Sequence, residues 1–268
     1  MIKIIDLSSK YESLYASCLH GQNSANESLC NAKLQWYHRM KPKGITVKLA
    51  LDDRGEAGGM IQYAPSEESF VLGKNLMILQ CIWVLNEKKG RGNFQKKGMG
   101  KALLKAFEED ARQKNKDGIV VWGLSIPVFM RASWFKKQGY IVADKMGIQT
   151  LLWKKLNTEA SPPEWMRQKK GPFINQNNVT VTCFKNGWCT EINRALSRAK
   201  EVVSEYEKDV KCEVVDTSEA DVMRIWGISD ALFIGSKEIP TGPAPEKKKI
   251  RKEINKAIKE LHKKKENK

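Results

Sequence analysis

The feature that most constrains the fold of this chain is a glycine loop between a predicted strand and a predicted helix. Gln95, Gly98 and Gly100 form the pattern Gln-x-x-Gly-x-Gly, with an apolar run at 76–84 before it and an amphipathic segment at 100–115 after it. Two glycines let the backbone bend close to a ligand and turn successive N–H groups inward. The start of a helix adds unpaired N–H groups and a partial positive charge. The segment therefore predicts a seat for a pyrophosphate group.

Two other phosphate-binding motifs are excluded because this segment lacks residues that they require. A P-loop requires Ser or Thr after its lysine to hold magnesium, but Lys101 is followed by Ala102. The dinucleotide fingerprint requires a third glycine, and Leu103 stands in its place. This loop after an apolar strand instead resembles the acetyl-CoA loop of the GNAT acyltransferases, whose pattern is Gln-x-x-Gly-x-Gly/Ala.

A second segment downstream extends the resemblance. Trp134–Tyr140 is similar to the GNAT signature Tyr-Glu-Lys-x-Gly-Phe, with Tyr140 in the place of its final aromatic, a core position. Hydrophobic periodicity predicts elements in the GNAT order β-α-α-β-β-β-α-β-α-β-β. The resemblance covers about residues 1–157 and implies an α/β fold with a mixed central sheet. The predicted segments are 1–7, 11–18, 26–40, 46–51, 59–63, 76–84, 100–115, 118–124, 129–138, 140–144 and 150–156.

The resemblance also implies how acetyl-CoA would be held. The strand that ends at Val84 would splay from its neighbour, and the backbone at Ile82 and Val84 would pair with pantetheine, with an N–H near Ile82 facing the thioester oxygen. The loop 86–94 carries Lys88, Lys89 and Arg91, which either cap the 3′-phosphate of the cofactor or are simply solvated. The pyrophosphate would lie on Gln95, Gly98, Gly100, Lys101 and Ala102.

The catalytic groups are less clear from the sequence. Transfer of an acetyl group to an amine requires a base for the amine and an acid for the departing thiolate. GNAT enzymes often use the tyrosine of the second signature as the acid, but Phe135 stands there and cannot donate a proton. The nearest proton donors are Ser133 on the same predicted helix and Cys81 on the cofactor strand, which we take as the candidate catalytic residues. The base stays open between Glu68 and Asp52.

The second half of the chain has a pattern of its own. A linker rich in proline and lysine, 158–178, precedes elements in the order β-α-β-α-β-β-α at 179–268, which resembles a smaller thioredoxin-like α/β domain ending in a Lys-rich helix. Cys189 at a predicted helix start would have its thiolate stabilised by the helix dipole. Ile192 stands where thioredoxins have the second cysteine of Cys-x-x-Cys, and Ser229 stands where they have the cis-proline that shapes the substrate groove. Cys183, at a strand end, is either a partner thiol or a core residue. The combination resembles bacterial GNAT proteins with a YoaP-like C-terminal domain.

Length and composition limit the classes of function. The 268 residues predict two domains, and no run approaches the 18 apolar residues of a membrane span. Six scattered cysteines without a Cys-x-x-Cys pair suit the reducing cytoplasm and predict no metal site. The net charge is +16, but eleven Lys and Arg against four Glu follow Pro245 in one predicted helix. A solvated helix and an anionic cofactor therefore explain the charge better than nucleic-acid binding.

The sequence thus predicts a cytoplasmic N-acetyltransferase that moves the acetyl group of acetyl-CoA to a primary amine of an unidentified acceptor. Two alternatives remain: a CoA-binding regulatory or interaction module without turnover, and a thiol-handling protein that uses Cys189. We also expect the two domains to pack together, with residues 188–193 closing the acceptor side of the cofactor strand.

Overall fold

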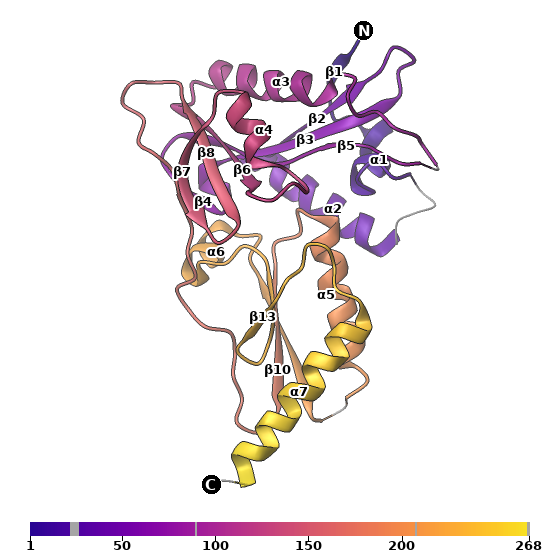
Figure 1. Cartoon of the computed structure of the whole chain (residues 1–268), viewed down its shortest axis with the longest axis vertical. Helices are drawn as coiled ribbons and strands as arrows, with labels where there is room; N and C mark the ends of the chain where they lie inside the picture. The colour runs from indigo at the N-terminus through magenta and orange to yellow at the C-terminus, as the bar shows by residue number, and fades with distance from the viewer. Residues whose placement is uncertain (22–26, 89, 207, 267–268) are drawn as a thin grey trace. The chain divides into compact units, whose positions relative to one another are not determined.

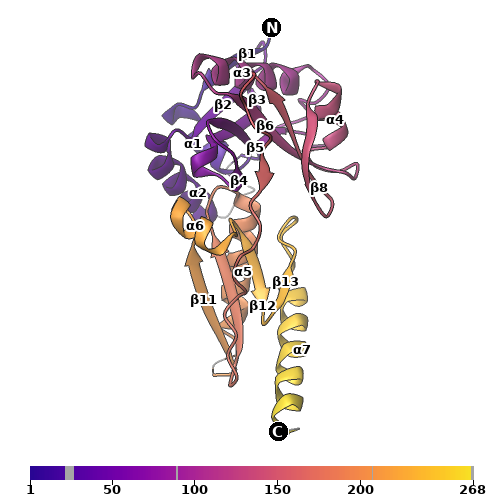
Figure 2. The same ribbon diagram turned by 90° about the vertical axis from the view of Figure 1, so that its left-hand side faces the viewer.

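The computed structural model describes residues 1–21, 27–88, 90–206 and 208–266 of the chain. The chain divides into two compact units, Met1–Met166 and Arg167–Lys268, which are drawn in Figure 1 and, turned by 90°, in Figure 2. Each unit has its own sheet and its own apolar core.

A seven-stranded sheet forms the centre of the first unit, in the order β1-β2-β3-β5-β6-β8-β7. Neighbouring strands are antiparallel except β5 and β6, which are parallel. The predicted mixed sheet is therefore confirmed. β5 is apolar almost throughout because its first half is covered on both faces. The strands are β1 (Lys3–Asp6), β2 (Thr46–Leu51), β3 (Ala57–Pro65), β5 (Leu76–Val84), β6 (Gly118–Leu124), β7 (Ile141–Met146) and β8 (Gln149–Lys155).

Helices cover both faces of this sheet in the predicted order. α1 (Glu12–Ala16) and α2 (Glu27–Met40) lie on one face, and α3 (Met99–Gln113) lies on the other, as Figure 1 shows. Asn26, the predicted first residue of the second helix, lies outside the described residues. A shorter helix, α4 (Ala132–Lys137), follows β6. α3 packs on its face of the sheet through one apolar stripe, which is formed by Met99, Leu103, Leu104, Phe107 and Ala111.

The first unit extends past residue 157, where the sequence places its end. Two short strands, β4 (Val71–Leu72) and β9 (Glu164–Trp165), pair antiparallel. Trp165 is buried and stacks on Phe70 with ring centroids 5.9 Å apart. Residues 158–166, assigned to the linker from their composition, therefore pack on the first unit, because one large aromatic side chain removes enough apolar surface from water to hold them.

The second unit also has the predicted order of elements. Its four-stranded sheet is ordered β11-β10-β12-β13, with β10 and β11 parallel and the other neighbours antiparallel. The elements are β10 (Val179–Lys185), α5 (Thr190–Val203), β11 (Val210–Asp216), α6 (Ala220–Trp226), β12 (Ala231–Ile234), β13 (Lys237–Ile239) and α7 (Lys247–Glu266).

Two apolar clusters hold this unit together. α5 and α7 cover one side of the sheet, where Ile250 and Ile254 of the Lys-rich helix are fully buried and Ile258 and Leu261 pack beside them. The Lys-rich helix therefore buries one apolar stripe against the sheet. A second cluster joins Phe184, Ile228, Ala231 and Phe233, with Trp226 of α6 packed against it.

Candidate functional site

β5 and β6 form a fork in the sheet of the first unit. The two strands pair in parallel only from Leu76 and Gly118 to Ile78 and Val120, although β5 continues to Val84. Side chains 76–80 of β5 are buried, and side chains 81–84 are only partly so. Because backbone N–H and C=O groups need partners, the far half of β5 is an edge that can pair with an extended ligand.

A buried chain of polar side chains fixes the point where the fork opens. Tyr15 Oη donates to Gln62 Oε1 (2.6 Å), and Gln62 Nε2 donates to Gln80 Oε1 (2.8 Å). The pairing of β3 and β5 shifts register at Gln62, so these hydrogen-bonded side chains lie at a β-bulge. Trp122 Nε1 donates to the Gln80 carbonyl (2.9 Å) and bridges the two strands. Such a satisfied, buried network holds one backbone geometry.

The glycine loop lies beside this fork. Gly98 precedes α3 with φ +90°, a conformation that favours glycine, and no side chain caps the helix start. A Cβ on Gly100 would stand 3.9 Å from Val84 Cγ2 and 3.7 Å from Trp134 Cζ2. The start of α3 therefore adjoins the end of β5. The segments predicted to hold the pyrophosphate and pantetheine therefore lie next to each other.

The charges around the loop suit an anionic ligand. Lys96, Lys97 and Lys101 are exposed at the loop and in the first turn of α3, and Ala102 is half-buried in the same turn. Exposed lysines at a helix start attract anions before contact and stabilise them afterwards.

Gln95, predicted to lie against the pyrophosphate, forms hydrogen bonds to the end of β5 and to its own loop. Its side-chain Nε2 donates to the Val84 carbonyl (3.2 Å), and its Oε1 accepts from Asn86 Nδ2 (3.4 Å). Its backbone N–H donates to Asn93 Oδ1 (2.8 Å). Gln95 therefore ties the loop to the end of β5 through its own polar groups.

The loop 86–94 is anchored by Arg91. The guanidinium donates to the carbonyls of Leu19 and Ala57, both at 2.9 Å. This favours a structural role for Arg91 over contact with a cofactor phosphate. Lys88 is exposed, and Lys89 lies outside the described residues.

The two faces of β5 differ in chemistry. Val84, and by alternation Ile82, face α3, so Cys81 and Trp83 face the side of α1 and α2. On that second face Trp83 lies 5.9 Å from the Phe129 ring, and Trp122 lies 6.2 Å from the same ring. These three aromatic side chains, Trp83, Trp122 and Phe129, form a wall along the fork, which we call the aromatic wall.

A histidine–carboxylate pair stands next to the aromatic wall. His20 Nδ1 lies 2.6 Å from Glu87 Oε1, and the His20 ring centroid is 6.4 Å from that of Trp83. The hydrogen bond from His20 and the backbone N–H of Arg91 hold the pKa of Glu87 below its ordinary value, so Glu87 is a carboxylate at neutral pH. The two residues are 67 positions apart in the sequence, and no motif joins them.

The candidate acids occupy different surroundings. Cys81 is half-buried on β5 at the fork, and Ser133 is exposed on α4. Phe135 is fully buried. Tyr140 is buried as predicted, and its hydroxyl donates to Glu108 (2.9 Å), while burial and the negative charge of Glu108 raise its pKa. It cannot deliver a proton near neutral pH.

The two carboxylates considered as bases from the sequence, Asp52 and Glu68, both bind other groups of the protein. Asp52 accepts backbone hydrogen bonds from Glu56 (2.9 Å) and Arg54 (3.0 Å), which hold its hairpin turn and lower its pKa. Glu68 lies 4.0 Å from Lys43 in an ion pair.

In the second unit, the half-buried carboxylate of Asp230 holds the turn that carries Cys189. Cys189 is the N-cap of α5. Trp188 Nε1 donates to Asp230 Oδ2 (2.7 Å), which also accepts from Ser229 Oγ (2.7 Å), and the Asn186 N–H donates to Asp230 Oδ1 (3.1 Å). Burial raises the pKa of Asp230 despite these hydrogen bonds. The donors aimed at Asp230 give the turn one defined shape.

Cys183 and Cys212 form a pair in the core of the second unit. Cys183 is fully buried, as a core residue would be, and shares a hydrogen bond with Cys212 on the adjacent strand. That bond lowers the pKa of Cys212 to about 7, and burial opposes the shift.

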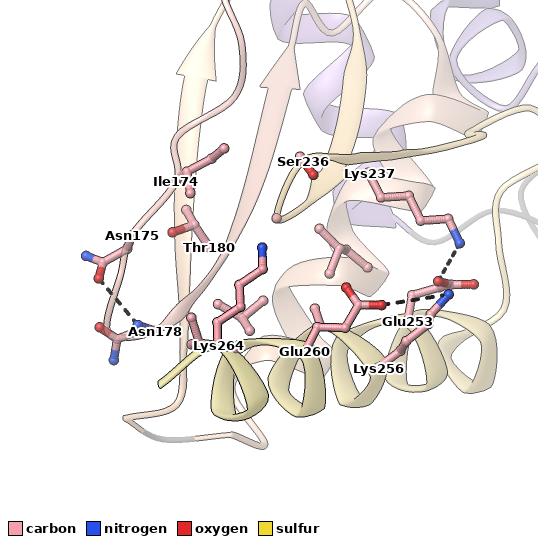
Figure 3. Close-up of a pocket in the computed structure, with 15 residues that line it drawn as sticks. Ile174, Asn175, Asn178, Thr180, Ser236, Lys237, Glu253, Lys256, Glu260 and Lys264 are labelled. Atoms are coloured by element: carbon pink, nitrogen blue, oxygen red, sulfur yellow. Dashed lines mark hydrogen bonds and ion pairs between the residues drawn. The ribbon is translucent and has the colours of Figure 1, made fainter. Parts of the chain in front are cut away.

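A shallow groove of about 190 Å³ lies between α7, the start of β10 and the β12–β13 turn (Figure 3). Its charged rim is paired: Lys237 Nζ lies 2.6 Å from Glu253, and Lys256 lies 3.9 Å from Glu260. None of the residues that the sequence predicts for a site lines this groove.

No protein-family model and no curated protein matches this chain. Among solved structures it is similar to a GNAT family acetyltransferase from Brucella melitensis in complex with acetyl-CoA, at 14% identity over 60% of this chain and 92% of that chain, TM-score 0.41. It is also similar to YncA, a putative acetyltransferase from Salmonella typhimurium with acetyl-CoA, at 18% identity over 60% and 97% of the two chains, TM-score 0.43.

A further similar structure is the GNAT family N-acetyltransferase YhbS from Escherichia coli in complex with CoA. Its identity to this chain is 13% over 61% of this chain and 89% of that chain, with a TM-score of 0.42. No helix in the described ranges combines the length and apolar content needed to cross a membrane. The same ranges hold no cluster of three side chains suited to a metal ion.

Proposed function

We propose that the first unit is an acetyl-CoA-dependent N-acetyltransferase of the GNAT type, which transfers the acetyl group to a primary amine. The observation that carries this proposal is the fork between β5 and β6 with the uncapped, glycine-led start of α3 beside it. An unpaired strand edge suits the amide groups of pantetheine, and a helix start suits a pyrophosphate.

Within this proposal, six of the seven predicted cofactor residues have a role that their surroundings support, and Gln95 ties the loop to the end of β5. The backbone at Ile82 and Val84 pairs with pantetheine, and an N–H near Ile82 stabilises the oxyanion that forms at the thioester carbon. Gly98 gives the loop its turn, and Gly100 leaves room for the pyrophosphate. The last two, Lys101 and Ala102, contribute their N–H groups, and Lys101 adds its charge.

Cys81 and Ser133 are the proposed sources of the proton for the CoA thiolate. Cys81 is on the strand that holds the cofactor, and Ser133 is exposed to solvent on α4. The departing sulfur needs one proton, which either side chain or water delivers. Replacing both residues by alanine in one protein distinguishes delivery by a side chain from delivery by water, because only delivery by water leaves the rate unchanged.

The second unit is proposed to be a thioredoxin-like, YoaP-like accessory domain that selects or presents the acceptor. The support is its strand order and the rigid Trp188–Asp230 turn, kept without a Cys-x-x-Cys pair. In full-length protein, Trp188→Ala should raise KM for the acceptor and leave acetyl-CoA binding unchanged. Normal acceptor kinetics would contradict an accessory role.

The test of cofactor binding is calorimetric titration of the full chain with acetyl-CoA. We expect heat of binding, and Gly100→Glu should abolish it by placing bulk and negative charge on the anion seat. Gly171→Glu is the matched control, because a side chain there meets no atom within 4 Å. Absence of heat with the unmodified protein at about millimolar cofactor would contradict the proposal.

Turnover separates the enzyme from a CoA-binding module. The protein is incubated with acetyl-CoA and a pool of primary amines, and free thiol is followed over time. Release of thiol that depends on the amines supports the enzyme. Binding without such release favours the non-catalytic alternative, for which the buried Phe135 at the usual place of the acid is the supporting observation.

A further inference from the structure

The His20–Glu87 pair lies on the face of β5 away from α3, where Cys81 is the candidate residue that the sequence identified. We infer that His20, held by Glu87, is the base that deprotonates the acceptor amine, and that the aromatic wall binds the apolar part of this acceptor. This inference rests on the proposed acetyl transfer and identifies the class of acceptor: a small primary amine on an aromatic or aliphatic chain.

The chain geometry around His20 is built to hold the ring at the fork. Cys18 and Leu19 have positive φ values of 52° and 70°, so two consecutive residues reverse the chain directly before His20. Leu19 is fully buried, and its carbonyl accepts from the Arg91 guanidinium (2.9 Å). Left-handed conformations are unfavourable for side chains other than glycine and persist where the surroundings enforce them.

The carboxylate is positioned by the same scaffold. Glu87 Oε2 accepts from the backbone N–H of Arg91 (3.1 Å), and its Oε1 faces His20 Nδ1. The side chains of His20 and Glu87 are 39% and 19% exposed, so the ring can pass a proton to solvent. Glu87 faces the ring directly, and Arg91 is linked to it through Glu87 and the Leu19 carbonyl.

This geometry defines the proton chemistry. A carboxylate facing Nδ1 favours the tautomer that carries hydrogen there, which leaves the lone pair of Nε2 as the acceptor. The amine nitrogen forms the C–N bond to the acetyl carbon and the carbonyl oxygen becomes the oxyanion; the C–S bond then breaks as the C=O bond forms again. Of the two protons that the ammonium loses, one passes through His20 to solvent and the other ends on the sulfur of CoA.

The aromatic wall defines what the amine is attached to. Phe129 is 38% exposed, and its neighbours Val128 and Ile126 are 51% and 42% exposed, so apolar surface extends from the wall into the loop after β6. Aromatic faces bind apolar groups and also attract an ammonium. The carboxylate next to the wall, Glu87, already binds His20, which disfavours polyamines that carry further charges.

The experiment uses the full chain with acetyl-CoA and 2-phenylethylamine, and spermidine as the comparison amine. His20→Gln should lower kcat/KM by about 100-fold at neutral pH, the usual contribution of a general base, with the Kd for acetyl-CoA unchanged. His38→Gln is the matched control, because His38 forms a similar pair with Glu12 (3.2 Å) elsewhere. An unchanged rate in His20→Gln would overturn the assignment of the base.

Glu87 acts through His20 and is tested by combining substitutions. Glu87→Gln should lower kcat, leave the Kd for acetyl-CoA unchanged, and have no further effect in the His20→Gln protein, because Glu87 acts only by positioning the ring. Phe129→Ala should raise KM for 2-phenylethylamine about tenfold, since a lost aromatic contact changes affinity by about this factor, while Phe173→Ala in the second unit should not. A further loss of rate in the double variant, or a preference for spermidine, would overturn the inference. Failure of acetyl-CoA to bind the unmodified protein would instead remove the proposed function.

Discussion

Gly98 and Gly100 are two residues apart, yet the structure predicts opposite effects on stability when each is changed to alanine. At Gly98 φ is +90°, and a Cβ would approach Ile2 Cδ1 to 3.3 Å. A left-handed alanine costs about 1 kcal/mol, so Gly98→Ala should lower the free energy of unfolding by about that amount. Gly100 is the second residue of α3, and a Cβ there meets its neighbours at 3.7 Å or more. Because alanine favours helix, Gly100→Ala should stabilise by about 0.5 kcal/mol.

Acetyl-CoA binding should distinguish the two positions as well. Gly98→Ala distorts the turn that presents the N–H groups to the pyrophosphate, so it should bind at least about tenfold more weakly, or about 1.4 kcal/mol. Alanine at position 100 fits the GNAT loop pattern, so Gly100→Ala is expected to be more stable than the unmodified protein and to bind acetyl-CoA about equally well. Urea unfolding and calorimetry measure the two quantities on the same samples. Undiminished affinity in Gly98→Ala would refute the proposed anion seat, and unchanged stability in Gly98→Ala would refute the backbone reasoning.

Two further predictions concern titrating groups. Burial works to raise the pKa of Asp110, but hydrogen bonds from Lys114 and Tyr63 outweigh it, and the pKa is lowered. A carboxylate whose pKa is lowered by folding stabilises the folded protein at neutral pH, and this stabilisation is lost as the pH falls below about 4. Asp110→Asn should therefore lose stability at neutral pH and lose less at pH 3, by thermal unfolding across pH; a gap of constant size would contradict this. Because Cys183 lowers the pKa of Cys212 to about 7, Cys183→Ala should slow alkylation of Cys212 at pH 7 by about tenfold, as peptide mass spectrometry after timed alkylation would show; an unchanged rate would exclude the thiol pair.

The sequence predicted the parts of the site that are encoded in contiguous residues. Gly98 before an amphipathic run indicates both the positive φ and the helix start, since each depends on a few neighbouring residues. The order of strands and helices followed for the same reason, because hydrophobic periodicity reports which face of an element is buried.

Other parts of the site could not be predicted from the sequence. The resemblance implies that β5 splays from a neighbour, but β5 stays apolar and β-prone beyond Ile78, and nothing in its residues shows that β6 leaves it at that residue. The same holds for pairs brought together by the fold: His20 with Glu87, Trp188 with Asp230 and Cys183 with Cys212. The extension of the first unit to Met166 depends on where Trp165 finds its aromatic partner.

The sequence by itself therefore determined the elements, their order and the glycine loop before α3. The tertiary structure alone decided where β5 loses its neighbour, which face of β5 carries the aromatic wall, and that His20 meets Glu87. The physical reason is the range of the interactions. Backbone conformation and periodicity are set by residues a few positions apart, whereas a strand edge left unpaired and a histidine set against a carboxylate depend on how distant segments pack.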